Sequence, residues 1–428
     1  MAKKVLDGIR VISIGSAWAG PYVGRVLAEL GAEVFRIELH GAARFGRGAP
    51  EAMEAWKKKL ISRGISVEDV EKAARRTPGD RGNYQPNNYG IGLDLRKDRG
   101  KEIYRQLAMV TDIIIDGFSP RAMVNLGLDY SVVKELKPDI IYVSIPAMGM
   151  FGSEKDVRMW GTGCEWVGGL TSIRGYPGGR PHRASCFIVD GIASPHILTA
   201  ILAALNYRAD TGKGQHIDLA QAECATSIMG RAIMDYTLNQ RVMKPTGNRH
   251  PAYAPHNAYP CKGDDMWVAI AVTSDKEWSS LCRVMGDPEW TTRPEFANPV
   301  SRWQHQDELD RLVGEWTSKH DHYAVQEMLQ RAGVPATAVV TMEEYVMHDP
   351  QVKERGIYQW LPYHDGVLDP IFRVPWILPK TPTVLDRCAP YVGQHNDHLL
   401  KDVLFMSDDE VAQLLEENVV GITPPETF

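Results

Sequence analysis

The chain has 428 residues, of which 44% are hydrophobic and 24% are charged. This balance is typical of a globular protein with a substantial core, and it excludes a disordered chain, a coiled coil and a minimal binding module. The 48 Lys and Arg residues against 54 Asp and Glu residues give a formal net charge of -6 without a long block of one sign, which argues against a nucleic-acid partner.

The six cysteines are far apart and form no C-x-x-C pair, so the sequence favours reduced thiols over a disulfide or zinc framework. The N-terminus leads directly into a patterned segment, and no run of 18 consecutive apolar residues occurs. We therefore expect a cytoplasmic protein that has no metal site and does not span a membrane.

The first strands and helix are visible as changes in periodicity. The stretch Ile9–Gly15 is apolar and β-branched, Pro21–Gly31 has helical spacing with a glycine as its stop, and Glu33–Glu38 again has the character of a strand. These three elements predict a right-handed βαβ unit with parallel strands.

The next segment, Ala49–Gly82, is rich in Ala, Glu, Lys and Arg and predicts a helical excursion on the surface. The alternation then resumes, and at least four parallel strands are expected. The predicted elements are a helix at Arg99–Val110, a strand at Asp112–Asp116, a helix at Arg121–Leu126 and a strand at Asp139–Ile145.

The second half begins with three more elements and a stretch rich in proline between Pro245 and Pro260, which has the composition of a linker. The elements before this linker are a helix at Ile192–Tyr207, a strand at Gln215–Leu219 and a helix at Ala222–Asn239. Those after it are a strand at Trp267–Val272 and helices at Lys276–Met285, Gln306–Thr317, Tyr323–Ala332 and His398–Phe405.

The predicted fold class is α/β, with a Rossmann-like large domain and a smaller α+β domain. The expected limits are 1–225 for the first part of the large domain, 226–255 for a linker, 256–340 for the small domain, and 341–428 for a second linker and a return to the large domain.

Asp190 is the residue with the strongest local signal for chemistry. It follows the apolar run Cys186–Val189 and precedes Gly191 and a strongly apolar helix, surroundings in which a carboxylate is rare. One interpretation is an N-cap that accepts N–H bonds from the following helix. The other is a desolvated nucleophile that attacks an activated carbonyl, and the two are compatible.

Other catalytic motifs are weak or missing from the sequence. The turn after the first strand lacks G-x-G-x-x-G and holds Trp18 where a backbone would approach a dinucleotide phosphate, although Glu38 stands where it would bond a ribose. No G-x-S-x-G, H-E-x-x-H or P-loop motif occurs. A basic approach to Asp190 could instead receive an anionic substrate or be a solvated loop. It consists of Arg174, Arg180, His182 and Arg183.

Four blocks in order resemble the class III CoA-transferases, the family of formyl-CoA, carnitine and benzylsuccinate CoA-transferases. They are LDGIRVISIGSAWAGPYVGRVLAELGAEVFRIE, GLDLRKDRGKEIYRQLAMVTDIIIDGFSPRAMVNLGLDY, LKPDIIYVSIPAMGMFG and VDGIASPHILTAILAALNYRADTGKGQHIDLAQAE. The resemblance covers nearly the whole chain. It implies a large domain built from both chain ends and an interlocked, ring-like dimer, either of one chain or with a paralogous subunit.

By this resemblance Asp190 is the catalytic residue, which forms an aspartyl-acyl anhydride and then an aspartyl-CoA thioester. Coenzyme A and acyl-CoA are then substrates, and no prosthetic group is needed. Backbone N–H groups near Gly168, Gly169 or Gly191 are candidates for stabilising the oxyanions. The resemblance also implies a set of CoA contacts. These are Ala17, Trp18, Leu93, Arg96, Gly117, Phe118, Arg121 and Arg158.

The sequence departs from formyl-CoA transferase close to the acyl group. Trp18 replaces a glutamine, Ala17 adjoins it, and the glycine-rich loop that shields the intermediates has no counterpart between Gly247 and Gly263. Trp18 and the arginine-rich approach to Asp190 favour a larger, partly apolar acceptor such as an aryl- or alkyl-succinate, for example benzylsuccinate, and succinyl-CoA is the expected donor. An acyl-CoA racemase, a carnitine-like or bile-acid-like transferase, and a non-catalytic CoA-binding subunit remain alternatives, with a nicotinamide dehydrogenase the most distant.

Overall fold

A computed structural model describes residues 4–15, 18–41, 58, 61–62, 66–67, 85–184, 186–364, 366 and 368–423. Contacts divide the chain into two compact units. The first contains residues 1–170, 183–231 and 356–428, and the second contains residues 171–182 and 232–355. The predicted excursion Ala49–Gly82 falls almost entirely outside the described residues.

A six-stranded parallel sheet forms the centre of the first unit, with the strand order β3-β2-β1-β4-β5-β6. The α/β prediction is therefore confirmed. The strands are β1 (Arg10–Ile14), β2 (Glu33–Glu38), β3 (Tyr89–Gly92), β4 (Ile113–Asp116), β5 (Ile141–Ser144) and β6 (Gln215–Asp218).

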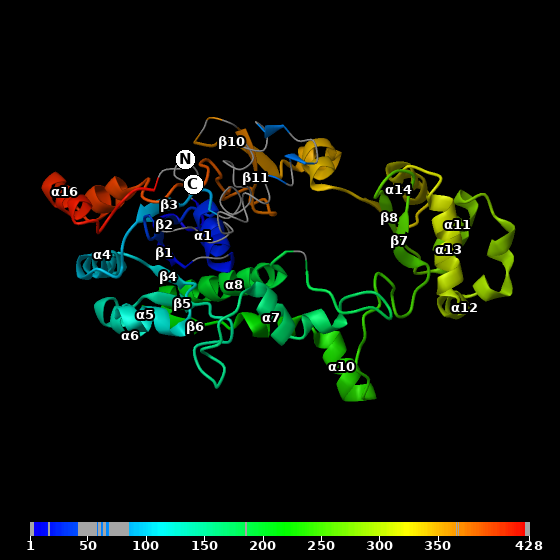
Figure 1. The fold of residues 1–428 in the computed structure, drawn as a ribbon, viewed down its shortest axis with the longest axis horizontal. Coiled ribbons are helices and arrows are strands. Elements are labelled where there is room, and N and C mark those ends of the chain that lie inside the picture. The colour runs from blue at the N-terminus through cyan, green and yellow to red at the C-terminus, as the bar shows by residue number, and fades with distance from the viewer. Residues whose placement is uncertain are drawn as a thin grey trace. The chain divides into compact units, whose positions relative to one another are not determined.

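Helices cover both faces of this sheet, because alternate strand residues point to opposite sides and both sets are apolar. Side chains of α1 (Ala19–Glu29) and α8 (Ile188–Thr211) pack on one face. Those of α4 (Asp98–Met109), α5 (Pro120–Leu126) and α6 (Tyr130–Leu136) pack on the other. Figure 1 labels these helices and the strands of the sheet.

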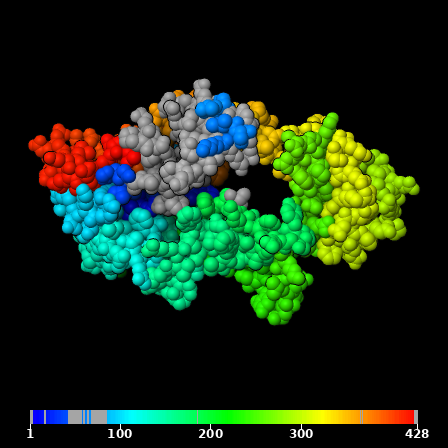
Figure 2. Space-filling view, viewed as in Figure 1, coloured from blue at the N-terminus to red at the C-terminus, as the bar shows by residue number. Residues whose placement is uncertain are grey.

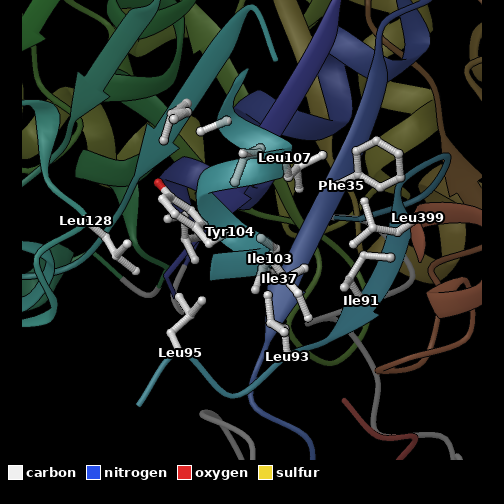
Figure 3. Packing of buried hydrophobic residues seen from close by; sticks show 14 of the residues in the cluster. Phe35, Ile37, Ile91, Leu93, Leu95, Ile103, Tyr104, Leu107, Leu128 and Leu399 are labelled. Atoms are coloured by element: carbon white, nitrogen blue, oxygen red, sulfur yellow. The ribbon is translucent and has the colours of Figure 1, made fainter. Parts of the chain in front are cut away.

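The C-terminal residues complete the second face of the sheet. Leu399 shares a buried cluster with Phe35, Ile91 and Leu107, which Figure 3 shows from close by. A short β-bridge joins Leu93 to Val420, and the C-terminal segment, red in Figure 2, lies against the cyan region of the chain. The remaining elements of this unit are α7 (Gly161–Val167), α9 (Gln221–Ser227), β10 (Tyr358–Pro362), β11 (Leu368–Phe372), the π-helix η5 (His398–Val403) and α16 (Asp408–Glu416).

The second unit has its own antiparallel sheet of three strands and a separate apolar core. Its strands are β7 (His256–Pro260), β8 (Trp267–Ala271) and β9 (Ala336–Val339). Its main helices are α11 (Asp275–Val284), α12 (Pro299–Gln304), α13 (Gln306–Thr317), α14 (His322–Arg331) and α15 (Pro350–Arg355). Short helices are η2 (Glu289–Thr292), η3 (Pro294–Phe296) and the π-helix η4 (Glu344–His348). The short helix η1 (Leu170–Ile173) begins at the last residue of the first unit's segment and continues into the second unit.

Two sequence-based predictions need correction. The single helix predicted at Ala222–Asn239 is two helices, α9 and α10 (Gly230–Asn239), because the chain turns at Met229, whose N–H bonds to the Thr226 carbonyl. The strand β3 was not predicted. It has two glycines and a single β-branched residue, so it lacks the apolar, β-branched pattern of its neighbours.

Candidate active site

Asp190 lies in the first turn of α8, where that helix meets the sheet. The helix begins at Ile188, so Asp190 is its third residue and not the N-cap. The N-cap position is held by Phe187, which makes no side-chain cap bond. The N-cap interpretation is therefore wrong, and Asp190 is instead an acidic residue within the first turn of the helix.

The two carboxylate oxygens of Asp190 have different surroundings. Oδ1 accepts a hydrogen bond of 3.2 Å from the backbone N–H of Ala19, the first residue of α1. Oδ2 is fully enclosed, and no donor among the described residues bonds to it. It occupies the space where Gly161, the first residue of α7, would carry a side chain.

The electrostatic environment of Asp190 is dominated by burial. The residue is 3% exposed, and desolvation raises its pKa to about 6, while the N–H of Ala19 acts in the opposite direction. In the described part of the chain no Lys, Arg or His forms an ion pair with it. The carboxylate is therefore ionised at pH 7 but is not neutralised by a cation, a state suited to nucleophilic attack.

Two side chains adjoin the nucleophile. Trp18 lies next to Gly191, so that an ideal Cβ on this glycine would be 3.7 Å from the tip of the indole. Cys164 in α7 is buried, and its pKa is raised to about 12 by desolvation and by the charge of Asp190. The site is thus apolar, with a neutral thiol and an indole around one carboxylate.

The structure places the two predicted contacts of the segment after β3 in different environments. Leu93 is 1% exposed and belongs to the core between β2, β3 and α4 (Figure 3). The Arg96 side chain is 70% exposed and makes a two-pronged ion pair with Asp94. Leu93 is thus packed in the core, whereas the Arg96 guanidinium remains accessible to an anion.

Gly117 and Phe118 follow β4 in a tightly held turn. The N–H of Gly117 donates to the Ile14 carbonyl, and the N–H of Phe118 donates to Oδ1 of Asp116 at 2.9 Å. The second oxygen of Asp116 accepts a bond of 3.1 Å from the Tyr142 hydroxyl. Because parallel strands end at one edge of the sheet, this turn lies at the carboxyl edge, where ligands of open α/β sheets bind.

Basic residues gather around Asp156. The Arg121 side chain, 69% exposed, pairs with this carboxylate, and nearby Lys155 and Arg158 help to lower its pKa, with the Arg121 hydrogen bond as the main cause. Arg121 and Arg158 therefore share one basic surface region. Ala17 lies outside the described residues.

The basic approach predicted before Asp190 is divided between the two units. Arg183 belongs to the first unit, whereas Arg174, Arg180 and His182 belong to the second. These four side chains therefore do not form a site within either unit alone.

The predicted oxyanion donors are already used within their own turns. The N–H groups of Gly168, Gly169 and Gly191 donate to the carbonyls of Cys164, Trp166 and Phe187. The donor that the structure places at the carboxylate is Ala19, a residue that sequence reasoning missed.

Two general features of the site concern metals and membranes. In the ranges that the structure describes, no group of three or more His, Cys, Asp or Glu residues could hold a metal ion. The helix α8 is long and apolar enough to span a membrane by length and composition only. It packs against α1, α9 and β5 and carries Asp190 in its first turn.

Comparison with known proteins shows to which family the chain belongs. The model of CoA-transferase family III matches residues 6–396. The chain is 30% identical to the succinyl-CoA–D-citramalate CoA-transferase of Chloroflexus aurantiacus, over 97% of this chain and 98% of that protein. It is 28% identical to the succinate–glutarate CoA-transferase of Agrobacterium fabrum, over 94% and 96% of the two chains.

A solved structure gives the same result for the fold. A CAIB/BAIF family protein from Brucella suis superposes with a TM-score of 0.80 at 27% identity, and the match covers 94% of this chain and all of that one. The chain belongs to CoA-transferase family III. It is accordingly an enzyme whose substrates are CoA thioesters.

Proposed function

We propose that Asp190 transfers CoA between two carboxylic acids by forming covalent intermediates. The observation that carries this proposal is the enclosed carboxylate, which is ionised at neutral pH; among the described residues one of its oxygens has no hydrogen-bond donor and no cation pairs with it. These properties favour nucleophilic attack on a thioester carbonyl.

The proposed reaction exchanges a carboxylate for a thiolate in balanced steps. Asp190 attacks the acyl carbon of the donor, the C–S bond breaks, and CoA leaves as its thiolate. The thiolate then attacks Cγ of the aspartyl-acyl anhydride, which releases the donor acid and leaves an aspartyl-CoA thioester. The acceptor carboxylate repeats these steps in reverse and departs as its CoA ester.

For CoA itself we propose the contacts that the family resemblance implies. The basic surface with Arg121 and Arg158, together with the exposed guanidinium of Arg96, suits the phosphates of CoA. Gly117 and Phe118 are proposed to lie along the cofactor. Leu93 is proposed to support the nucleotide pocket from within the core. Trp18 and Ala17 are proposed to lie beside the acyl group of the acyl-CoA.

We propose succinyl-CoA as the donor and an aryl- or alkyl-succinate, such as benzylsuccinate, as the acceptor. The indole of Trp18 beside the nucleophile supports an apolar acyl group. With succinyl-CoA as donor, replacement of Trp18 by Ala is expected to lower kcat/KM for benzylsuccinate about tenfold to a hundredfold relative to glutarate, because an aromatic contact is lost. Steady-state assays with both acids check this ratio.

A small polar dicarboxylic acid is the second candidate acceptor. It is favoured by the names of the two relatives, which act on D-citramalate and glutarate. In the deciding experiment the enzyme is incubated with succinyl-CoA and one of benzylsuccinate, glutarate, citramalate or carnitine, and the amount of each new CoA ester is measured. Transfer to benzylsuccinate alone supports the first acceptor, and transfer only to the small acids overturns it.

The same assay distinguishes transferase from racemase chemistry. A racemase would incorporate solvent deuterium at the α-carbon of an acyl-CoA without any second acid. CoA transfer without such incorporation supports the proposal, whereas deuterium uptake without transfer contradicts it.

For assembly we propose an interlocked dimer, of this chain alone or with a paralogous subunit. Large apolar side chains exposed on α8 and just after α9 support this, since such surface is usually covered. They include Leu202, Tyr207 and Ile228. Native mass spectrometry of the purified chain is expected to show a dimer, and a stable monomer that transfers CoA would contradict it. The proposed location is the cytoplasm.

A further inference from the structure

The two oxygens of Asp190 are not equivalent in this fold. One is bonded to the N–H of Ala19, and the other is enclosed beside Gly161 with no donor from the residues that the structure describes. Since only one oxygen of a carboxylate attacks, this asymmetry determines what each position does during the reaction.

We infer that the Ala19 N–H is the oxyanion donor for the aspartyl intermediates, and that Gly161 is a positioning residue that holds the other oxygen as the nucleophile. This inference rests on the proposed covalent function of Asp190. It assigns a role to two positions for which the sequence offers no motif.

The role of Ala19 follows from which bonds form and break. When Oδ2 bonds to the acyl carbon, Oδ1 becomes the carbonyl oxygen of the anhydride. Attack of the CoA thiolate on Cγ places the negative charge on Oδ1, and the Cγ–Oδ2 bond then breaks as the donor acid leaves with that oxygen. A donor already bonded to Oδ1 stabilises this charge without reorganisation.

Neighbouring groups make Ala19 suited to this task. It is the first residue of α1, a helix of eleven residues, so its N–H has no acceptor within the helix and carries part of the positive end of the helix dipole. Trp18 precedes it as the N-cap and makes no side-chain cap bond.

The role of Gly161 follows from space. Its backbone φ is not positive, so the conformation does not itself demand glycine. An ideal Cβ there would overlap Oδ2, and it would lie 3.2 Å from Cγ of Asp190 and 3.5 Å from Cβ of Phe187. A side chain at this position would therefore push the carboxylate away from Ala19.

The test compares Gly161→Ala with a matched control, Gly230→Ala. Gly230 is also the first residue of a helix and also lacks a positive φ, but an ideal Cβ there meets nothing within 4 Å. Both changes raise helix propensity equally. We expect G161A to lower kcat about 100-fold with little change in KM for the acyl-CoA, and G230A to behave as wild type.

The pH profile separates positioning from a general structural defect. Because the Ala19 hydrogen bond lowers the pKa of Asp190, its loss in G161A is expected to move the acid limb of kcat/KM to higher pH. A G161A enzyme with wild-type kcat and an unshifted acid limb overturns the inference.

A measurement on the unaltered enzyme keeps the inference testable if G161A does not fold. Protein labelled with [4-13C]aspartate is incubated with succinyl-CoA, and isotope-edited infrared difference spectra record the aspartyl thioester carbonyl. A frequency below that of an unbonded thioester supports the Ala19 bond, and an unbonded frequency overturns it. Absence of any aspartyl thioester would instead remove the proposed function itself, so the two failures are distinguishable.

Discussion

Asp190 and Asp116 are both buried aspartates at the large sheet, 3% and 5% exposed, and desolvation raises the pKa of each to about 6. They differ in their hydrogen bonds. Asp116 has a donor on each oxygen, from Phe118 and Tyr142, whereas within the described ranges Asp190 has a donor on one oxygen only. Burial alone therefore does not identify a nucleophile, and the oxygen without a donor is the informative feature.

The largest expected effect is on catalysis. Asp190→Asn should lower kcat for CoA transfer by on the order of 10⁴-fold or more, because the nucleophile is lost. Asp116→Asn should retain activity within about tenfold, since its amide oxygen still accepts from Phe118 and only the turn that carries Gly117 is perturbed. Equal losses in the two variants, measured with succinyl-CoA, would remove the distinction between them.

The next effect concerns pH. Asp190 attacks only when ionised, so kcat/KM should fall about tenfold for each pH unit below about 6 and level off above it. Values of kcat/KM measured from pH 4.5 to 8 for the Asp116→Asn variant should show the same fall on the acid side of the pH profile. If that fall disappears in D116N, then Asp116 and not Asp190 is the group that titrates.

Stability should change in opposite directions at the two sites. A carboxyl whose pKa is raised on folding lets the folded state bind more protons, so stability falls as pH rises from about 4 to about 6, and the penalty is complete above that. At pH 7, Asp190→Asn should therefore raise the free energy of unfolding by on the order of 2 kcal/mol.

Asp116→Ala should instead lower the free energy of unfolding by about 1 kcal/mol, because two buried donors lose their acceptor and this outweighs removal of the charge. Urea unfolding at pH 7 measures both variants. A stabilised D116A would show that its two hydrogen bonds contribute little.

The smallest effect is expected from a change that makes Asp116 resemble Asp190 by removing one of its two hydrogen-bond donors. Tyr142→Phe removes the donor to Oδ2 of Asp116, a bond that lowers the pKa of this carboxyl, so its pKa should rise further above about 6. Carbon-13 NMR of labelled aspartate follows this titration, while CoA transfer should stay within about threefold of wild type.

Much of this fold could be predicted from the sequence, because its strands and helices carry their own periodicity. The elements at β1, α1, β2, α4 and β5 lie within a few residues of their predicted positions. Among the strands of the six-stranded sheet the exception is β3, whose glycines are explained by contacts with residues far away in the sequence. Ideal Cβ atoms at Gly90 and Gly92 would overlap the carbonyl oxygens of Tyr391 and Gly421. Local sequence contains no signal for such contacts.

The candidate site was predictable only in part, for the same reason. Asp190 stands out locally as a carboxylate in an apolar run, but its partner Ala19 is 171 positions away in the sequence. Gly161 has no turn, cap or positive φ to mark it. Residues whose roles depend on the meeting of α1, α7 and α8 can be found only from the folded arrangement.

Covalent attachment of CoA to Asp190 is the step on which the proposed function depends. The measurement is to incubate the enzyme with succinyl-CoA without an acceptor, trap the thioester with hydroxylamine or borohydride, and digest with trypsin. Cleavage after Arg183 and Arg208 yields a peptide in which Asp190 is the only acidic residue. We predict a mass change on Asp190 that is missing in Asp190→Asn, whereas an unmodified peptide from enzyme that turns over succinyl-CoA would contradict the account.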